Sequence, residues 1–210
     1  MVAVGRSLDG EQAELAVPAC PEWTVREVFA HQAGVCADIL AGRMEGVATD
    51  DWTARQVAER ADHSLPRILD EWDRDAPAVV ELLAPVADQV DPRLLGDQWT
   101  HDQDVRGAVG RPGARNDRRA GYVTRGLIGA FVQRVGAADL DPVIVDTGLA
   151  DVPAGGARLV VDPFEFARAG LGRRSRAQMS AWAWPVDDPG PYIDVLPVFT
   201  ARTTDLVEPG

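Results

Sequence analysis

The sequence predicts an α+β protein in which a helical part, residues 1–138, precedes a smaller α/β part, residues 139–210. Up to about residue 135, apolar side chains recur with the 3.6-residue period of amphipathic helices. After Gly136 the pattern changes to short β-branched runs, 143–145 and 158–161, which are bounded by Gly, Pro and Asp as strands usually are. We therefore expect a domain boundary near residue 138.

The first clear helix is expected to begin after Thr24 and to run to about Gly42, because Thr24 and Glu27 form a capping-box pattern. A second such pattern, from Thr53 to Gln56, predicts a helix that runs to about residue 61. Further helices of the larger part are expected at 65–75, 79–83, 94–109 and 121–135. In the smaller part, helical patterns cover 163–171, 175–184 and 191–198.

Composition and charge disfavour two classes of partner. The 33 acidic and 21 basic side chains give a net charge of -12, which repels phosphate backbones and anionic lipid, so we expect neither nucleic acid nor membrane as a partner. No apolar run approaches the roughly 20 residues that a bilayer-spanning helix needs. Residues 1–9 lack the apolar core of a signal peptide, so we expect a cytoplasmic protein with reduced thiols at Cys20 and Cys36. Cys36 is predicted to be a small buried residue.

The chain has three histidines, His31, His63 and His101, of which His31 and His101 are candidate metal ligands. Asp97 and His101 are four residues apart in one expected helix, so their side chains point the same way, and His31 lies on the inner side of another helix. Two imidazoles and a carboxylate can hold a divalent ion and leave positions open for water or substrate. Spacing alone leaves two alternatives: a surface hydrogen bond between Asp97 and His101, and a hydrogen-bonded core histidine at position 31. His63, beside Asp62 at a helix break, is expected to be solvated.

Four other polar residues are candidates for chemistry. Asp104 is seven residues after Asp97 and shares its helix face, so it could orient a metal ligand or act as a base. For Asp104 and Arg106 the alternative is a solvated or salt-bridged pair. Arg173 and Arg174 precede a helix, and guanidinium groups bind carboxylates in a bidentate way, so an anion clamp is one interpretation. An exposed basic turn is the other.

Several segments together resemble the mycothiol-dependent maleylpyruvate isomerase family. The run from Cys20 to His31, CPEWTVREVFAH, resembles one signature of that family. The run from Asp97 to Ala108, DQWTHDQDVRGA, resembles a second one, with a carboxylate four residues before His and an Asp-x-Arg-x-Ala tail. Residues 52–60 and 164–178 match further segments in the family's order, so the resemblance spans nearly the whole chain.

The resemblance implies a DinB-like antiparallel four-helix bundle that binds a divalent metal, usually zinc, followed by a small domain like that of sterol carrier proteins. It carries over His31, Asp97 and His101 as the metal ligands. Because few residues precede Cys20, we expect the first bundle helix to be short. The family's thiol co-substrate is mycothiol, the low-molecular-weight thiol of actinobacteria.

We therefore predict a metal-dependent thiol S-transferase or isomerase that acts on a small electrophilic substrate. Arg173, Arg174 and Asp104 are predicted to be its catalytic residues, and Arg106 is predicted to contact the thiol cofactor. The carboxylate clamp requires the two domains to pack together over the metal. The alternatives are a non-catalytic metal- or ligand-binding module and a metal-dependent hydrolase. As assemblies we expect a monomer or a homodimer.

Overall fold

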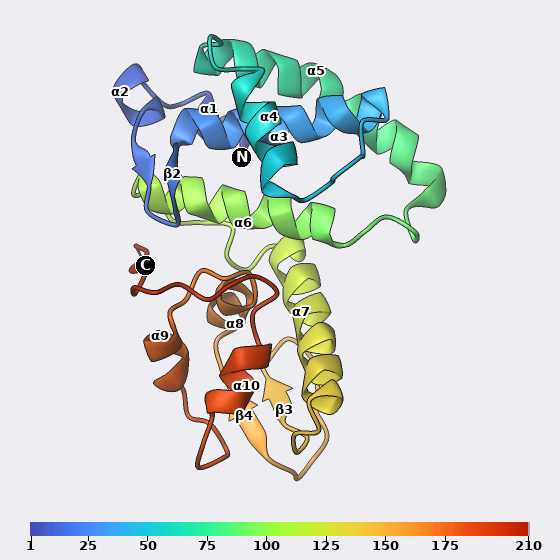
Figure 1. The fold of residues 1–210 in the computed structure, drawn as a ribbon, viewed down its shortest axis with the longest axis vertical. Helices are drawn as coiled ribbons and strands as arrows, with labels where there is room; N and C mark the ends of the chain where they lie inside the picture. Colours follow the sequence, from blue (N-terminus) through green and yellow to red (C-terminus); the bar gives the residue numbers. More distant parts are fainter. Residues whose placement is uncertain (210) are drawn as a thin grey trace. The chain divides into compact units, whose positions relative to one another are not determined.

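The computed structural model describes residues 1–209 and confirms the α+β class, with many helices and two small two-stranded sheets (Figure 1). Contacts divide the chain into a first unit, Met1–Leu94 with Asp104–Arg111, and a second unit, Leu95–Gln103 with the chain from Pro112 onward. Helix α6, Arg93–Ala108, is one unbroken helix that contributes residues to both units. These units are a different partition of the chain from the expected domains, whose boundary at residue 138 stays a prediction.

Helix α3, Val25–Ala41, forms as its capping pattern predicts. The Thr24 hydroxyl accepts the backbone N–H of Glu27, whose carboxylate in turn accepts the N–H of Thr24 at 2.8 Å. The helix ends at Gly42, which has the left-handed φ of 66° that glycine adopts without a steric cost. Its buried face, which includes Val28 and Phe29, packs against α5, and α4 crosses it (Figure 1).

Helix α4, Asp50–Ala58, does not begin where the second capping pattern predicts. The N-cap is Thr49, whose hydroxyl accepts the N–H of Trp52, and Thr53 lies inside the helix. Asp50 and Asp51 explain the earlier start, because carboxylates in the first turn interact favourably with the helix dipole. Gln56, the supposed partner of the Thr53 cap, is fully buried instead.

Helix α5, Leu65–Leu83, is one helix where the sequence predicts two, and it continues through Pro77 into the short 3-10 turn η1, Ala84–Val86. Proline removes one backbone hydrogen bond, but buried Leu69, Trp72 and Val79 keep the apolar stripe continuous on both sides of it. No helix within residues 1–209 combines the length and the hydropathy that crossing a bilayer requires.

The chain before Thr24 forms no long helix. It contains two one-turn helices, α1 (Val2–Gly5) and α2 (Gly10–Ala13), and an antiparallel pair of strands, β1 (Ala16–Val17) and β2 (Cys20–Thr24). The Cys20–Thr24 signature segment is therefore a strand that leads directly into α3.

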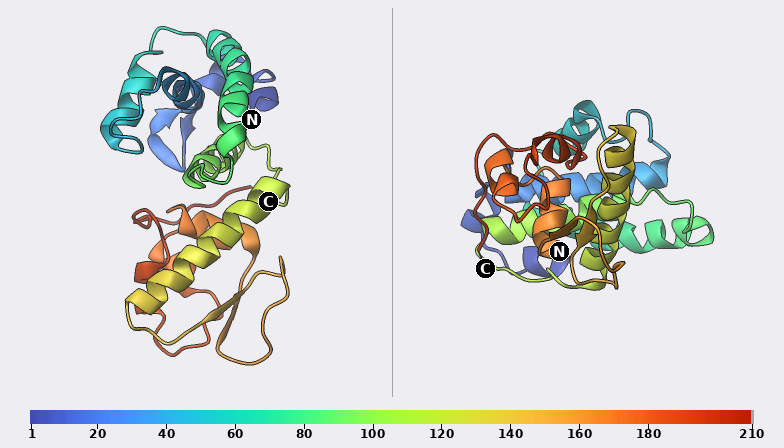
Figure 2. Two further views of the ribbon diagram at one scale, coloured as in Figure 1. Left: turned by 90° about the vertical axis from the view of Figure 1, so that its right-hand side faces the viewer. Right: turned by 90° about the horizontal axis from the view of Figure 1, so that it is seen from below.

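The second unit contains α7 (Arg118–Ala137), strands β3 (Ile144–Asp146) and β4 (Arg158–Val160), and helices α8 (Pro163–Gly170), α9 (Arg176–Ser180) and α10 (Gly190–Val195). The two strands pair in parallel, with Val145 opposite Leu159. Helix α7 packs against α8 and α10 (Figures 1 and 2). Phe131, Phe166 and Leu159 are fully buried in the core of this unit. Each predicted strand and helix of the smaller part has a counterpart here, but the helix predicted over 175–184 ends at Ser180.

Candidate metal centre

His31 lies in the middle of α3, and only 1% of its surface is exposed. Trp23 and Trp52 flank the imidazole, with ring centroids 5.2 Å and 6.4 Å away. Its Nδ1 atom is 2.8 Å from the side-chain oxygen of Gln56. At Nδ1, His31 is thus a hydrogen-bonded core histidine, as one of the two alternatives predicts. Whether His31 can also bind a metal depends on its other ring nitrogen, Nε2.

The hydrogen bonds behind His31 fix its tautomer. The Gln56 amide nitrogen donates to the buried carboxylate of Asp38 at 2.7 Å, so the amide oxygen must be the atom that faces His31. That oxygen can only accept, and therefore Nδ1 carries the proton and Nε2 keeps its lone pair for a metal. The guanidinium nitrogens of Arg43 and Arg55 lie 2.7 Å and 3.3 Å from the Asp38 carboxylate oxygens and balance its negative charge.

Gly34 allows the side chain of Gln56 to come close enough to bind His31. A Cβ atom at Gly34, one turn after His31, would lie 2.5 Å from the Cβ of Gln56 and 2.7 Å from its Cγ. Such distances are closer than van der Waals contact permits, so the approach of α4 to α3 depends on the missing side chain at position 34. Gln56 can donate to Asp38 and accept from His31 because the two helices lie this close.

Asp97 and His101 meet on one face of α6, as their spacing predicts. The His101 Nε2 atom is 3.4 Å from the Asp97 carboxylate, which is longer than the 2.7–3.2 Å typical of a hydrogen bond. Two ligand atoms about 2.0–2.1 Å from one zinc ion lie roughly 3.3–3.4 Å apart at the tetrahedral angle. The pair therefore has the separation of two ligands of one ion, and the donor set of two imidazoles and a carboxylate fits zinc.

The ligand atoms of His31, Asp97 and His101 all lie within 4.8 Å of one another. The same holds for Cys20, His101 and Asp104, of which Asp104 is almost fully buried. Sequence reasoning treated Cys20 as an ordinary reduced thiol and missed it as a possible ligand. Its place at the start of the CPEWTVREVFAH signature was the signal that could have found it.

Cys36 is distinct from Cys20 in its environment. Burial raises the pKa of the Cys36 thiol to about 11, helped by the negative charge of Asp75. The thiol is therefore protonated near neutral pH, which argues against a nucleophile. Cys36 is half-buried, less enclosed than the predicted buried residue.

Of the predicted anion clamp, Arg174 is buried and fully engaged, whereas Arg173 is half-buried and donates to the carbonyl of Leu171 at 3.0 Å. Arg174 makes a bidentate pair with Glu165, at 2.6 Å and 2.7 Å, and also contacts Glu208 at 2.8 Å. The alternative of an exposed basic turn is therefore wrong for Arg174. Arg106, in the last turn of α6, is half-buried, and its role toward a cofactor stays a prediction.

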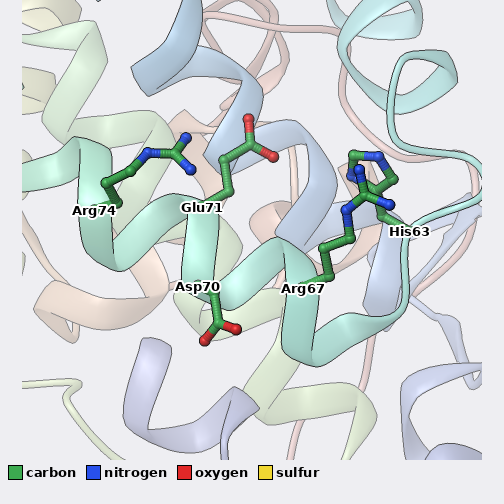
Figure 3. A pocket seen from close by; sticks show the side chains of 5 residues that line it. All are labelled: His63, Arg67, Asp70, Glu71 and Arg74. Atoms are coloured by element: carbon green, nitrogen blue, oxygen red, sulfur yellow. The ribbon is translucent and has the colours of Figure 1, made fainter.

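A shallow cavity of about 340 Å³ lies elsewhere in the first unit, along α5 and the turn before it (Figure 3). Its lining residues are His63, Arg67, Asp70, Glu71 and Arg74. Arg6 pairs with Asp70, and Arg60 pairs with Glu71. None of His31, Asp97 and His101 lines this cavity, and the charges of its own lining residues balance one another. His63 is half-buried and not fully solvated as predicted.

Comparison with known proteins places the chain in a family. A model of the mycothiol maleylpyruvate isomerase N-terminal domain matches residues 1–114, which is more than half of the chain. The match includes His31, Asp97 and His101. No curated protein and no solved structure gives a significant match. The family match and the ligand clusters together support a divalent metal and a small thiol as partners. The chain therefore belongs to the mycothiol maleylpyruvate isomerase family, whose DinB-like members bind metals.

Proposed function

We propose that this chain is a divalent-metal-dependent thiol S-transferase or isomerase that uses a mycothiol-type thiol on a small electrophilic substrate. The observation that carries the proposal is the donor set of His31, Asp97 and His101, whose ligand atoms lie within 4.8 Å of one another inside a segment that matches the family. Helices α3 to α6 would be the helices of its DinB-like bundle, and zinc is the metal that best fits two imidazoles and a carboxylate.

Each residue then has a defined task. His31 binds through Nε2, because Gln56 occupies its Nδ1, and Asp97 and His101 complete one face. A bound divalent ion lowers the pKa of a coordinated thiol, so that thiolate forms near neutral pH. Asp104, seven residues after Asp97 on the same helix, would accept the thiol proton.

Two further roles concern ligand binding. Arg106 would contact the thiol cofactor, and Arg173 and Arg174 would hold a carboxylate group of the substrate. Guanidinium groups suit this task because their donors match the two oxygens of a carboxylate. The reaction is then addition of the thiolate to an electrophilic carbon, which gives either transfer of the thiol or a cis–trans isomerisation after its release.

Metal content tests the first step of the proposal. We expect about one equivalent of zinc or a similar ion per chain by elemental analysis, and its loss in His31→Ala and His101→Ala, because each removes one of three protein ligands. His63→Ala is the matched control, because His63 is the remaining histidine of the chain and belongs to neither signature segment and to neither ligand cluster. This variant should keep the metal. Well-folded wild-type protein without metal, even after reconstitution with zinc, would contradict the proposal.

Thiol binding and turnover separate the proposal from its alternatives. Calorimetric titration with mycothiol should show metal-dependent binding, lost in His101→Ala. A metal-dependent hydrolase would retain its metal but bind no thiol. A sequestering module would bind the thiol without turning over any electrophile offered with it.

A further inference from the structure

A carboxylate of the chain itself occupies a site between two buried arginines of the second unit. Arg168 is fully buried, and its Nη2 and Nε donate to the two oxygens of Glu208 at 2.7 Å and 3.2 Å. Arg174, 3% exposed, donates to the same carboxylate at 2.8 Å. Two guanidinium groups thus converge on one carboxylate that is 6% exposed.

The two arginines are positioned without help from Glu208. The Thr100 hydroxyl accepts from Arg168 Nη1 at 2.8 Å, and Glu165 holds Arg174 through two hydrogen bonds. Each guanidinium is therefore held by other groups while it donates to Glu208. This is the arrangement of a built anion site, in which the supporting residues orient the groups that bind the ligand.

Positive charge is concentrated around this position. Arg115, Arg168 and Arg174 all lie within 6.0 Å of the centre of the Phe164 ring. Glu165 pairs with Arg174, and Glu208 pairs with both Arg168 and Arg174. Removal of Glu208 takes a shared counter-ion away from two buried guanidinium groups, and this favours binding of an external carboxylate.

The segment that brings Glu208 to the site is held by individual hydrogen bonds and not by regular secondary structure. Among them, Arg115 donates to the carbonyl of Pro209, and the side-chain oxygen of Gln178 accepts the N–H of Leu206 at 3.2 Å. Residues 203–209 form no helix or strand, and after Arg202 pairs with the backbone at Ser175 the chain runs beside α9 (Figure 1). Leu206 is buried, Gln178 donates to its carbonyl at 2.8 Å, and Asp205 accepts from the Ser175 hydroxyl. Such a strap can leave without unfolding the helices that carry the arginines.

We propose that Arg168, Arg174 and Thr100 form a binding site for a small organic carboxylate and that Glu208 is its built-in, displaceable occupant. The strap is then autoinhibitory: an external carboxylate binds when residues 203–209 move away. The proposal rests on the carboxylate-binding role proposed for Arg174, and it requires neither the metal nor the thiol.

The test is a calorimetric titration of the full chain with succinate, at constant ionic strength and without thiol. A tethered carboxylate competes at an effective concentration in the millimolar range, so we expect succinate to bind Glu208→Gln at least about tenfold more tightly than wild type. Glu81→Gln is the matched control, since it makes the same chemical change at an exposed position of α5, away from the strap and its arginines, and it should behave as wild type. Equal succinate affinity in folded Glu208→Gln and wild type would overturn the proposal.

A second measurement uses unaltered protein. Displacement of the strap should expose the bond after Arg202 to trypsin, so succinate should accelerate release of the peptide that follows Arg202, relative to sodium chloride of equal ionic strength. An unchanged rate would contradict displacement. Two further variants keep the two proposals apart: His101→Ala, and His101→Ala combined with Glu208→Gln. If the second variant binds succinate more tightly than the first, the carboxylate site is supported even if the metal-dependent chemistry proves wrong.

Discussion

At the scale of single residues, one side chain that is not a candidate ligand still supports the candidate metal centre. Gln56 joins His31 to Asp38 through two hydrogen bonds of 2.8 Å and 2.7 Å, and thereby selects the ring nitrogen that carries the proton. Supporting residues of this kind orient a ligand and raise its basicity. The affinity for a metal should therefore respond to Gln56 as well as to the ligands.

Replacing Gln56 by Leu should weaken zinc binding about 10- to 100-fold, because His31 loses the acceptor that holds Nδ1–H and the ring is free to rotate or change tautomer. Competition with a chromogenic chelator measures the affinity. Gln89→Leu, an exposed glutamine before α6, makes the same chemical change away from the site and should leave the affinity unaltered. An undiminished affinity in Gln56→Leu would show that the hydrogen bond does not position His31.

Gln56 also shows which structural features a short sequence pattern can predict. The pair Thr24 and Glu27 forms a capping box because both partners lie within one turn of each other. The pair Thr53 and Gln56 has the same spacing but lies inside α4, since Thr49 and two following aspartates start the helix earlier. Four-residue patterns do not contain the long-range packing that buries Gln56 beneath His31, so its role could not be predicted.

The candidate ligands also divide into those brought together by one helix and those brought together by long-range packing. Asp97 and His101 are one turn apart, and their proximity follows from helix geometry alone. His31 is a candidate because it lies on the inner side of its own helix, and the family resemblance carries it over as a ligand. The three together remain a prediction that the 4.8 Å cluster supports. The pairing of Glu208 with Arg168 joins residues 40 positions apart, and no sequence pattern indicated it.

At the scale of secondary-structure elements, the contact between α3 and α4 determines whether Gln56 reaches His31. Gly34→Ala places a methyl group 2.5 Å from the Cβ of Gln56, so the helices must separate. Overpacking of this kind costs about 1–3 kcal/mol of unfolding free energy, and zinc affinity should fall with it. Urea denaturation and the chelator competition measure the two effects.

Gly129→Ala is the control for that substitution. Gly129 lies in the exposed middle of α7, where an added Cβ meets nothing within 4 Å. Alanine favours the helix over glycine by up to ~1 kcal/mol, so this variant should be stabilised. A stability of Gly34→Ala equal to or above that of Gly129→Ala would show that α3 and α4 are not in close contact.

At the scale of the whole molecule, ion pairs of Arg168 and Arg174 with carboxylates lie beside Phe164 in the second unit. Burial raises the pKa of Glu165, but the hydrogen bonds and positive charge of Arg174 outweigh it, and the pKa lies below its ordinary value of 4.5. Burial likewise lowers the pKa of Arg174, and its bonds to Glu165 reverse that effect. The pair therefore stabilises the folded state only while Glu165 is ionised.

The pH dependence of stability follows from the direction of this shift. A carboxylate with a depressed pKa contributes its full stabilisation above pH 4.5, and the contribution is lost as the pH falls through the lower pKa of the folded state. Because 39% of the Glu165 side chain is exposed, solvent screening keeps the contribution at or below ~1 kcal/mol. Urea denaturation of wild type and Glu165→Gln should therefore show wild type as the more stable at pH 7, with the difference shrinking toward zero as the protein is acidified. Glu81→Gln, on the exposed side of α5, should track wild type throughout. A difference that persists unchanged in acid would mean that Glu165 acts through packing alone, and that the charge balance argued for Arg168, Arg174 and Glu208 does not govern this unit.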